Sequence, residues 1–99
     1  MKGTILEPKT KPKLEDPKQY KVLLHNDDFT PMEFVVKVLH AIFQMSEPQA
    51  VNLMLYVHQH GVGVCGIYSF EVAETKITQV HEMAEKKNYP LMCSMEETE

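Results

Sequence analysis

The chain has 99 residues, of which 43% are hydrophobic and 24% are charged, and its net charge is −4. This length supports a single domain with one modest core, and the composition excludes a fully disordered chain. The negative charge, without a basic run that carries interleaved aromatic residues, argues against a nucleic-acid-binding protein.

Targeting signals and cysteines indicate the compartment. No apolar stretch approaches the ~20 residues of a membrane-spanning helix, and the polar N-terminal residues contain no signal-peptide core. Cys65 and Cys93 are too few for a disulfide framework, and both lie in apolar runs. We therefore expect buried, reduced thiols in a monomeric cytoplasmic protein that needs no membrane, metal or cofactor.

The composition changes near Gln19. Residues 1–19 carry five lysines, three acidic residues and few apolar side chains, whereas residues 20–99 carry five lysines, eleven acidic residues and most of the apolar side chains. A segment with so little apolar surface cannot form a core. We predict a flexible N-terminal tail over residues 1–19 and a folded domain over residues 20–99.

The folded domain opens with a predicted strand and helix. The segment YKVLLH, residues 20–25, combines alternation with β-branched and aromatic residues, which is typical of a strand. The letters TPME then predict a capping box, with Thr30 as N-cap and Glu33 three residues later. Phe29 and Phe34 fit a hydrophobic staple around this helix start.

The first helix leads into a second one. Its buried face is predicted from apolar residues at helical spacing, namely Val35, Val38, Leu39 and Ile42. The segment SEPQ from Ser46 to Gln49 again has the pattern of a capping box. The second helix should run to about His60 and end at Gly61, where a left-handed residue costs little.

Three further elements complete the domain. Residues 62–68 read as a strand, and a third helix starts near Ser69. That helix carries lysines at its electronegative C-terminal end, and its buried face consists of Ala73, Ile77, Val80 and Ala84. Pro90 forces an extended restart, so residues 91–95 should form the last strand. The order β-α-α-β-α-β predicts an α+β fold in which three helices pack on a three-stranded antiparallel sheet.

Polar residues gather in the loop before the first helix. The letters HNDD, from His25 to Asp28, place two adjacent carboxylates between a strand and a helix start, where they face either water or a positive ligand. On the second helix Met54, Val57 and His58 stand at i, i+3 and i+4, so they share one face. This arrangement suits a small pocket with one polar wall and one apolar wall.

Each of these features also has a purely structural interpretation. The two aspartates favour the helix dipole, a single histidine commonly satisfies a hydrogen bond, and methionines such as Met32 and Met54 fill cores. His58 and His60 are two residues apart on a helix and point in different directions, which argues against a shared metal ion.

Enzymatic interpretations find little support in the sequence. The candidate nucleophiles, Cys65 and Cys93, lie inside predicted strands and not on an exposed turn. Neither the nucleophile-elbow motif nor a phosphate-binding glycine loop occurs, and the histidines lack the H-E-x-x-H spacing. We therefore predict a binding module and not an enzyme.

Three separated motifs resemble one known family. The segments YKVLLHNDDFTPMEFVVKVL, LMLYVHQHGVGVCGIYSFEVAETK and YPLMCSMEE strongly resemble ClpS, the bacterial adaptor that recognises N-terminal degradation signals (N-degrons) and hands their bearers to a AAA+ Clp unfoldase. The resemblance covers residues 20 to about 97. It implies a ClpS-like adaptor domain that binds a free N-terminal Leu, Phe, Tyr or Trp.

The resemblance also implies roles for individual residues. Asn26, Asp27 and His58 would surround the α-amine, and Asp28 would add negative potential or hold the loop. The side-chain pocket would be lined by Thr30, Met32, Met54, Val57 and Leu91, with Met32 acting as a gate against β-branched residues.

A second surface would contact the unfoldase. The motif EVAETK implies that Glu71, Thr75 and Lys76 meet the N-terminal domain of a ClpA-type or ClpC-type unfoldase, which works with the ClpP protease; a solvated helix face is the structural alternative. Two other functions remain open from the sequence. One is a regulatory module that binds a Clp-type chaperone without a substrate pocket, and the other is a small hydrolase.

Overall fold

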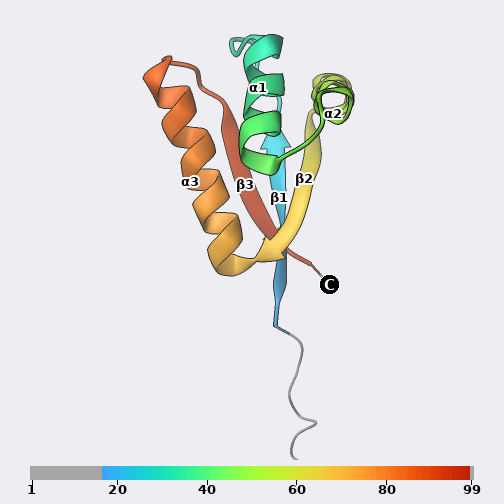
Figure 1. The fold of residues 1–99 in the computed structure, drawn as a ribbon, viewed down its shortest axis with the longest axis vertical. Helices are drawn as coiled ribbons and strands as arrows, with labels where there is room; N and C mark the ends of the chain where they lie inside the picture. The colour runs from blue at the N-terminus through green and yellow to red at the C-terminus, as the bar shows by residue number, and fades with distance from the viewer. Residues whose placement is uncertain (1–16, 99) are drawn as a thin grey trace, which may run out of the picture.

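The computed structural model describes residues 17–98, and these form an α+β domain of three helices and a three-stranded antiparallel sheet. The elements in chain order are β1 (Gln19–His25), α1 (Met32–Phe43), α2 (Glu47–His60), β2 (Val62–Ser69), α3 (Phe70–Lys86) and β3 (Met92–Glu97) (Figure 1). The predicted fold class and element order are confirmed. The prediction of a flexible tail falls mostly on residues 1–16, which lie outside the described residues.

The first strand is the centre of the sheet, whose strand order is β2-β1-β3. Val22 pairs with Gly66 and Leu23 with Val64, so Cys65 is the extra residue of a β-bulge. The helices α1 and α3 lie together on one side of the sheet (Figure 1). Consequently Val22 and Leu24, which point to that side, are both 0% exposed.

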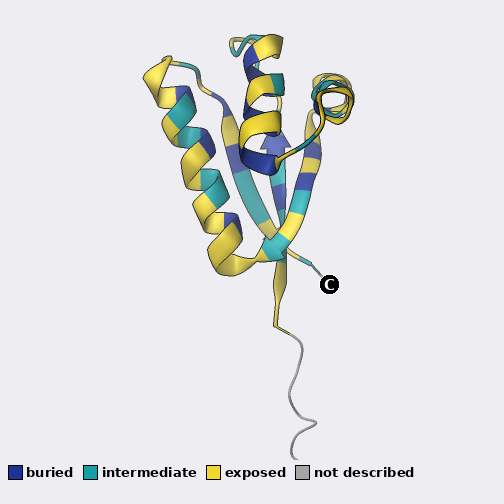
Figure 2. Ribbon diagram, in the orientation of Figure 1, coloured by how far each residue is buried: buried dark blue, intermediate teal, exposed yellow. Residues whose placement is uncertain are grey.

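The core lies between the sheet and these two helices. Val38 and Leu39 of α1 and Val80 of α3 are fully buried against it, and Figure 2 shows the buried stripes along both helices. Removing a methyl or methylene group from such positions costs roughly 1 kcal/mol or more, because the transfer and cavity terms add. The buried face predicted for the first helix is therefore confirmed.

The start of α1 differs from the prediction. Its N-cap is Pro31 and not Thr30, and no side chain caps the helix. The Thr30 side chain is turned toward the Asp27 carboxylate, to which its hydroxyl donates over 2.8 Å, and it accepts no hydrogen bond from a backbone N–H of α1. The capping box predicted at TPME is therefore wrong.

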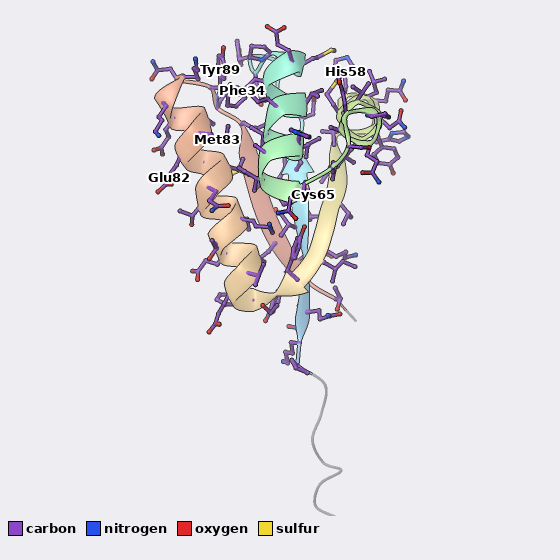
Figure 3. All side chains as sticks on the ribbon, viewed as in Figure 1. Phe34, His58, Cys65, Glu82, Met83 and Tyr89 are labelled. Atoms are coloured by element: carbon purple, nitrogen blue, oxygen red, sulfur yellow. The ribbon has the colours of Figure 1, made fainter. Side chains whose placement is uncertain are left out.

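The predicted hydrophobic staple is also wrong. Phe29 is 78% exposed, so it contributes nothing to the core. Phe34 packs edge to face against Tyr89, with ring centroids 4.9 Å apart (Figure 3). This tertiary contact with the segment before β3 takes the place of the predicted local contact between Phe34 and Phe29.

The second helix begins and ends as predicted. Ser46 N–H donates to Gln49 Oε1 over 2.9 Å and Gln49 N–H donates to Ser46 Oγ over 3.3 Å, which completes the capping box. Gly61 ends the helix at φ 93°, in the left-handed region that glycine tolerates.

Both cysteines are free and buried, as predicted. A hydrogen bond with the Cys93 thiol, together with burial, holds the pKa of the Cys65 thiol far above its ordinary value. Burial, with a smaller contribution from Cys65, also raises the pKa of Tyr68. The Cys65 thiol therefore has little thiolate character at neutral pH, and both buried cysteines serve as packing groups.

Candidate functional site

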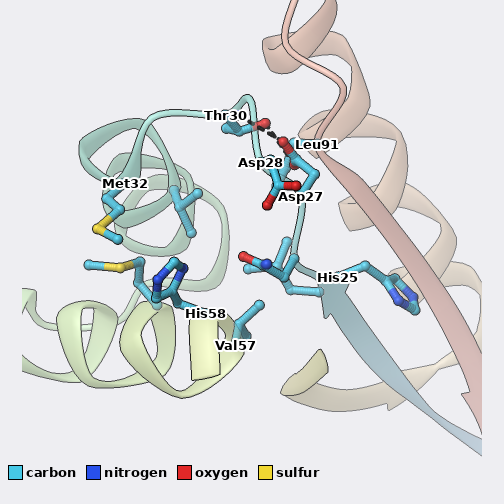
Figure 4. A pocket seen from close by; sticks show the side chains of 12 residues that line it. His25, Asp27, Asp28, Thr30, Met32, Val57, His58 and Leu91 are labelled. Carbon is cyan, nitrogen blue, oxygen red and sulfur yellow. Dashed lines mark hydrogen bonds between the residues drawn. The ribbon is translucent and has the colours of Figure 1, made fainter. Parts of the chain in front are cut away.

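A cavity of about 160 Å³ opens at the end of the sheet where β1 ends and β3 begins. The HNDD loop, the first turns of α1, the second half of α2 and the residue before β3 enclose it (Figure 4). All nine residues predicted for peptide binding line this single cavity: Asn26, Asp27, Asp28, Thr30, Met32, Met54, Val57, His58 and Leu91.

The inner wall of the cavity is apolar. Val57 and Leu91 are 3% and 5% exposed, and Val35 of α1 joins them at 9%. An apolar cavity of roughly 150 Å³ is large enough to bind benzene. The space therefore suits one large apolar side chain, such as a phenyl or isobutyl group.

Close packing of β2 against α2 shapes this wall. A Cβ atom built on Gly63 would lie 2.8 Å from Val57 Cγ2, so a side chain at position 63 would push Val57 into the cavity. The backbone N–H of Asn26 also donates to the carbonyl of Gly61 over 2.9 Å. The HNDD loop is thereby tied to the end of α2, which brings the loop and His58 to one opening.

Asp27 organises the loop itself. Its Oδ1 accepts hydrogen bonds from the backbone N–H groups of Phe29 at 2.8 Å and Thr30 at 2.7 Å, and its Oδ2 accepts from Thr30 Oγ1 at 2.8 Å (Figure 4). This is the geometry of an Asx turn. The resemblance implied that Asp28 adds negative potential or holds the loop. The bonds that hold the loop are made by Asp27, and one lone pair of Asp27 Oδ2 is left for a ligand.

The mouth of the cavity is polar and negatively charged. Asn26, Asp28 and His58 are exposed and line the cavity, and Figure 4 shows the side chains of Asp27, Asp28 and His58 around the opening. Among the described residues that line the cavity, two are aspartates and none is lysine or arginine. The mouth therefore attracts a cation, while the inner wall accepts an apolar group.

Three lining residues were not predicted: Leu24, His25 and Val35. Val35 follows Met32 by one helical turn, so the helical spacing could have revealed it. The ring of His25 points away from the cavity (Figure 4), and its Nε2 lies 2.7 Å from Ser94 Oγ. Phe29 and Tyr56 are not among the lining residues.

The candidate unfoldase surface lies on α3, away from the cavity. Glu71 and Thr75 are exposed on its first turns. Lys76 is half-buried and donates to the carbonyl of Ile42 over 2.8 Å. Its ammonium lies 5.7 Å and 5.3 Å from the ring centroids of Phe43 and Tyr68. The charge of Lys76 is therefore engaged inside the domain, at the C-terminal end of α1 where a cation is favoured.

Other classes of site were sought over residues 17–98. Within that range, no helix is long and apolar enough to cross a membrane. The same range holds no group of three or more histidine, cysteine, aspartate or glutamate side chains that could ligate a metal ion.

Comparison with known proteins assigns the chain to a family. Residues 15–94 match the family model of the ATP-dependent Clp protease adaptor protein ClpS. An ATP-dependent Clp protease adapter protein ClpS from Parvibaculum lavamentivorans is 57% identical over 94 residues, which cover 95% of this chain and 86% of that protein. The corresponding protein of Phenylobacterium zucineum is 59% identical over 87 residues, covering 88% of this chain and 80% of the relative.

A solved structure agrees with these relatives. Agrobacterium tumefaciens ClpS2 bound to L-phenylalaninamide matches with a TM-score of 0.82 and 40% identity, over 84% of this chain and 100% of that one. The matching folds, the sequence identity and the family model all lead to the same assignment. The chain belongs to the ClpS family of ATP-dependent Clp protease adaptors, which are binding proteins and not enzymes.

Proposed function

We propose that this chain binds proteins and peptides with a free N-terminal Leu, Phe, Tyr or Trp and delivers them to a ClpA-type or ClpC-type AAA+ unfoldase for degradation by ClpP. The observation that carries this proposal is the cavity, which combines an apolar inner wall with an acidic mouth. The ligand of Agrobacterium tumefaciens ClpS2, L-phenylalaninamide, has two groups that match these features: a phenyl group for an apolar wall and an α-amine for an acidic mouth.

The polar groups at the mouth receive the α-amine. An α-amine has a reference pKa of ~7.7–8.0, so it is mostly a cation at neutral pH. Asn26 and His58 provide hydrogen-bonding groups and Asp28 provides an exposed negative charge. Asp27 adds its charge and the remaining lone pair of Oδ2, while its other lone pairs hold the loop in shape.

The apolar residues receive the first side chain. Val57 and Leu91 form the buried end of the cavity, and Met54, which is partly buried, also lines it. Met32, which is 46% exposed, borders the opening. In the proposed function, Met32 acts as a gate at this border and excludes first residues with a branch at the β-carbon.

The expected affinity is moderate. Charge-assisted hydrogen bonds contribute ~1.5–3 kcal/mol each, and burial of a leucine or phenylalanine side chain contributes a further ~1.5–3 kcal/mol. Peptide ordering and lost rigid-body freedom oppose these terms. A dissociation constant around the micromolar level, about 8 kcal/mol, is consistent with an adaptor that must release its cargo.

The first turns of α3 form the proposed unfoldase interface. Glu71 and Thr75 are accessible there, and they lie on a different element from the cavity, so cargo and unfoldase can be held together. Lys76 supports this surface from inside through its bond to Ile42. The buried free thiols are consistent with work in the cytoplasm, where thiols stay reduced.

A peptide panel tests the binding function. Fluorescence anisotropy should show saturable binding of labelled peptides that begin with Leu, Phe, Tyr or Trp, and no binding of the same sequences beginning with Gly or carrying an acetylated N-terminus. Binding that ignores the first residue or its amine would refute the proposal, and the absence of saturable binding would favour the regulatory module without a substrate pocket. Mass spectrometry of the peptides after incubation should find them intact, because a shortened peptide would indicate a hydrolase.

The unfoldase interface needs a separate measurement. Glu71→Lys should weaken binding to the isolated N-terminal domain of the unfoldase while leaving peptide affinity unchanged, since Glu71 does not line the cavity. Equal binding of that domain by the variant and the unchanged chain would remove Glu71 from the interface.

A further inference from the structure

Met32 has a combination of properties that no other described methionine shares. Two of the methionines in residues 17–98 are more than a third exposed, Met32 at 46% and Met92 at 54%. Two line the cavity, Met32 and Met54, and Met54 is partly buried against the core. Among these methionines, Met32 alone both lines the cavity and is more than a third exposed to solvent.

We propose that Met32 is a reversible oxidation site through which hydrogen peroxide switches off peptide binding, an inference that rests on the function proposed above. A lone pair of the Met32 sulfur attacks one peroxide oxygen and forms the S–O bond. The O–O bond breaks, and the departing hydroxide takes the proton from the oxygen now bound to sulfur and leaves as water. Sulfur is oxidised by two electrons, peroxide is reduced by two, and the product is methionine sulfoxide.

The sulfoxide conflicts with the environment of a bound side chain. Its oxygen is a strong hydrogen-bond acceptor that water satisfies when the cavity is empty. A bound peptide covers that position with an apolar first side chain, which has no hydrogen-bond donor. Of the lining side chains that can donate, Thr30 is bonded to Asp27, and Asn26 and His58 receive the α-amine in the function proposed above. Burying a polar group without a partner weakens binding, on the order of tenfold or more.

Peroxide should not change peptide binding through either cysteine or through Met92. Both cysteines are buried, so their thiols are protected from the same oxidant. Met92 is exposed on β3 but is not among the residues that line the cavity. It therefore serves as an internal control, a methionine that peroxide reaches with no expected effect on binding.

The test follows peptide affinity during mild peroxide treatment of the full chain. Peptide mapping by mass spectrometry measures sulfoxide at each methionine, and anisotropy with a Phe-initiated peptide measures affinity at the same time points. We expect affinity to fall about tenfold or more in step with sulfoxide at Met32, and to return after treatment with methionine sulfoxide reductases.

Two leucine variants locate the effect. In Met32→Leu, which keeps an apolar side chain of similar volume, the ratio of affinities before and after peroxide should stay near one, whatever the starting affinity. In Met92→Leu, this ratio should fall as in the unchanged chain. The time course of the unchanged chain needs no variant, so it remains decisive if Met32→Leu folds poorly.

The outcomes are separable from those of the proposed function. Absence of peptide binding before any oxidation refutes the proposed function. Good initial binding that persists when Met32 is fully oxidised overturns the oxidation site alone. Loss of affinity in Met32→Leu after peroxide, or a Met32 that stays unmodified while Met92 is oxidised, overturns it as well.

Discussion

Replacing Asp27 by alanine should lower both the stability of the domain and its affinity for peptides. The Asp27 carboxylate accepts from two backbone N–H groups, at 2.8 and 2.7 Å, and from the Thr30 hydroxyl at 2.8 Å. Alanine leaves these three donors to water and releases the turn. The side chains of Asn26 and Asp28 then lose their fixed positions at the mouth of the cavity.

The expected loss of stability in Asp27→Ala depends on how far Asp27 is buried. Loss of a comparable capping side chain costs ~0.5–2 kcal/mol, and the half-buried position of Asp27 places the expected cost at about 1–2 kcal/mol. For a domain of this size, each kcal/mol lowers the midpoint of thermal unfolding by about 4–8 °C. The peptide affinity should fall as well, because both a charge and the loop geometry are lost.

Asp28 and a conservative variant provide the comparison. Asp28 is exposed, so Asp28→Ala should change stability by less than ~0.5 kcal/mol. It should still weaken peptide binding at least about fivefold, because a charge pair 4 Å apart near a surface is worth ~1–4 kcal/mol. Asp27→Asn keeps an acceptor for the two N–H groups and should retain most of the stability while losing the charge.

Thermal unfolding by circular dichroism and anisotropy with a Phe-initiated peptide measure the two effects. The reasoning is refuted if Asp27→Ala unfolds at the same temperature as the unchanged chain. It is also refuted if Asp28→Ala is the less stable of the two variants, because the loop would then depend on the other carboxylate.

Four further predictions concern the ligand, the gate, a buried cation and the thiols. Raising the pH from 7 to about 9.5 should weaken peptide binding at least tenfold in an anisotropy titration, because the α-amine loses its proton above its pKa of ~7.7–8.0; unchanged affinity would show that the amine charge plays no part. Met32→Ala should admit peptides that begin with Ile or Val, and a first-residue preference identical to that of the unchanged chain would remove the gate assignment. Lys76→Met should lower the free energy of unfolding by about 1–2 kcal/mol in urea, because the bond to the Ile42 carbonyl is lost; an unshifted midpoint would show that this bond contributes nothing. Because the pKa of Cys65 is raised and both thiols are buried, iodoacetamide at about pH 8 should label Cys65 and Cys93 only after unfolding, and rapid labelling of the native chain would contradict their burial.

Local sequence patterns succeeded where short-range interactions decide the conformation. The second helix shows this most clearly, since Ser46 and Gln49 cap each other and Gly61 ends the helix with its own left-handed conformation. Such features need no distant partner, so they can be read from neighbouring letters. The capping box and the hydrophobic staple predicted at the first helix were wrong, because Thr30 donates a hydrogen bond to Asp27 and Phe34 packs against Tyr89.

For the candidate site as well, local patterns indicated some features and contacts between elements decided others. Residue types and spacing indicated a mixed polar and apolar face on α2 and an acidic loop before α1, and the family resemblance joined them into one site. That they enclose one cavity depends on the bond between Asn26 and Gly61 and on the close approach at Gly63. Both are contacts between elements, which no local pattern encodes.

The sequence by itself determined the element order, the buried faces and the chemistry available to the site, because these follow from periodicity, turn residues and side-chain type. Only the tertiary structure decided that Lys76 turns inward to the Ile42 carbonyl and that Asn26 ties the HNDD loop to Gly61 at the end of α2. Several hydrogen-bond partners compete for each polar group, and the competition is settled by which partner the folded chain brings within about 3 Å.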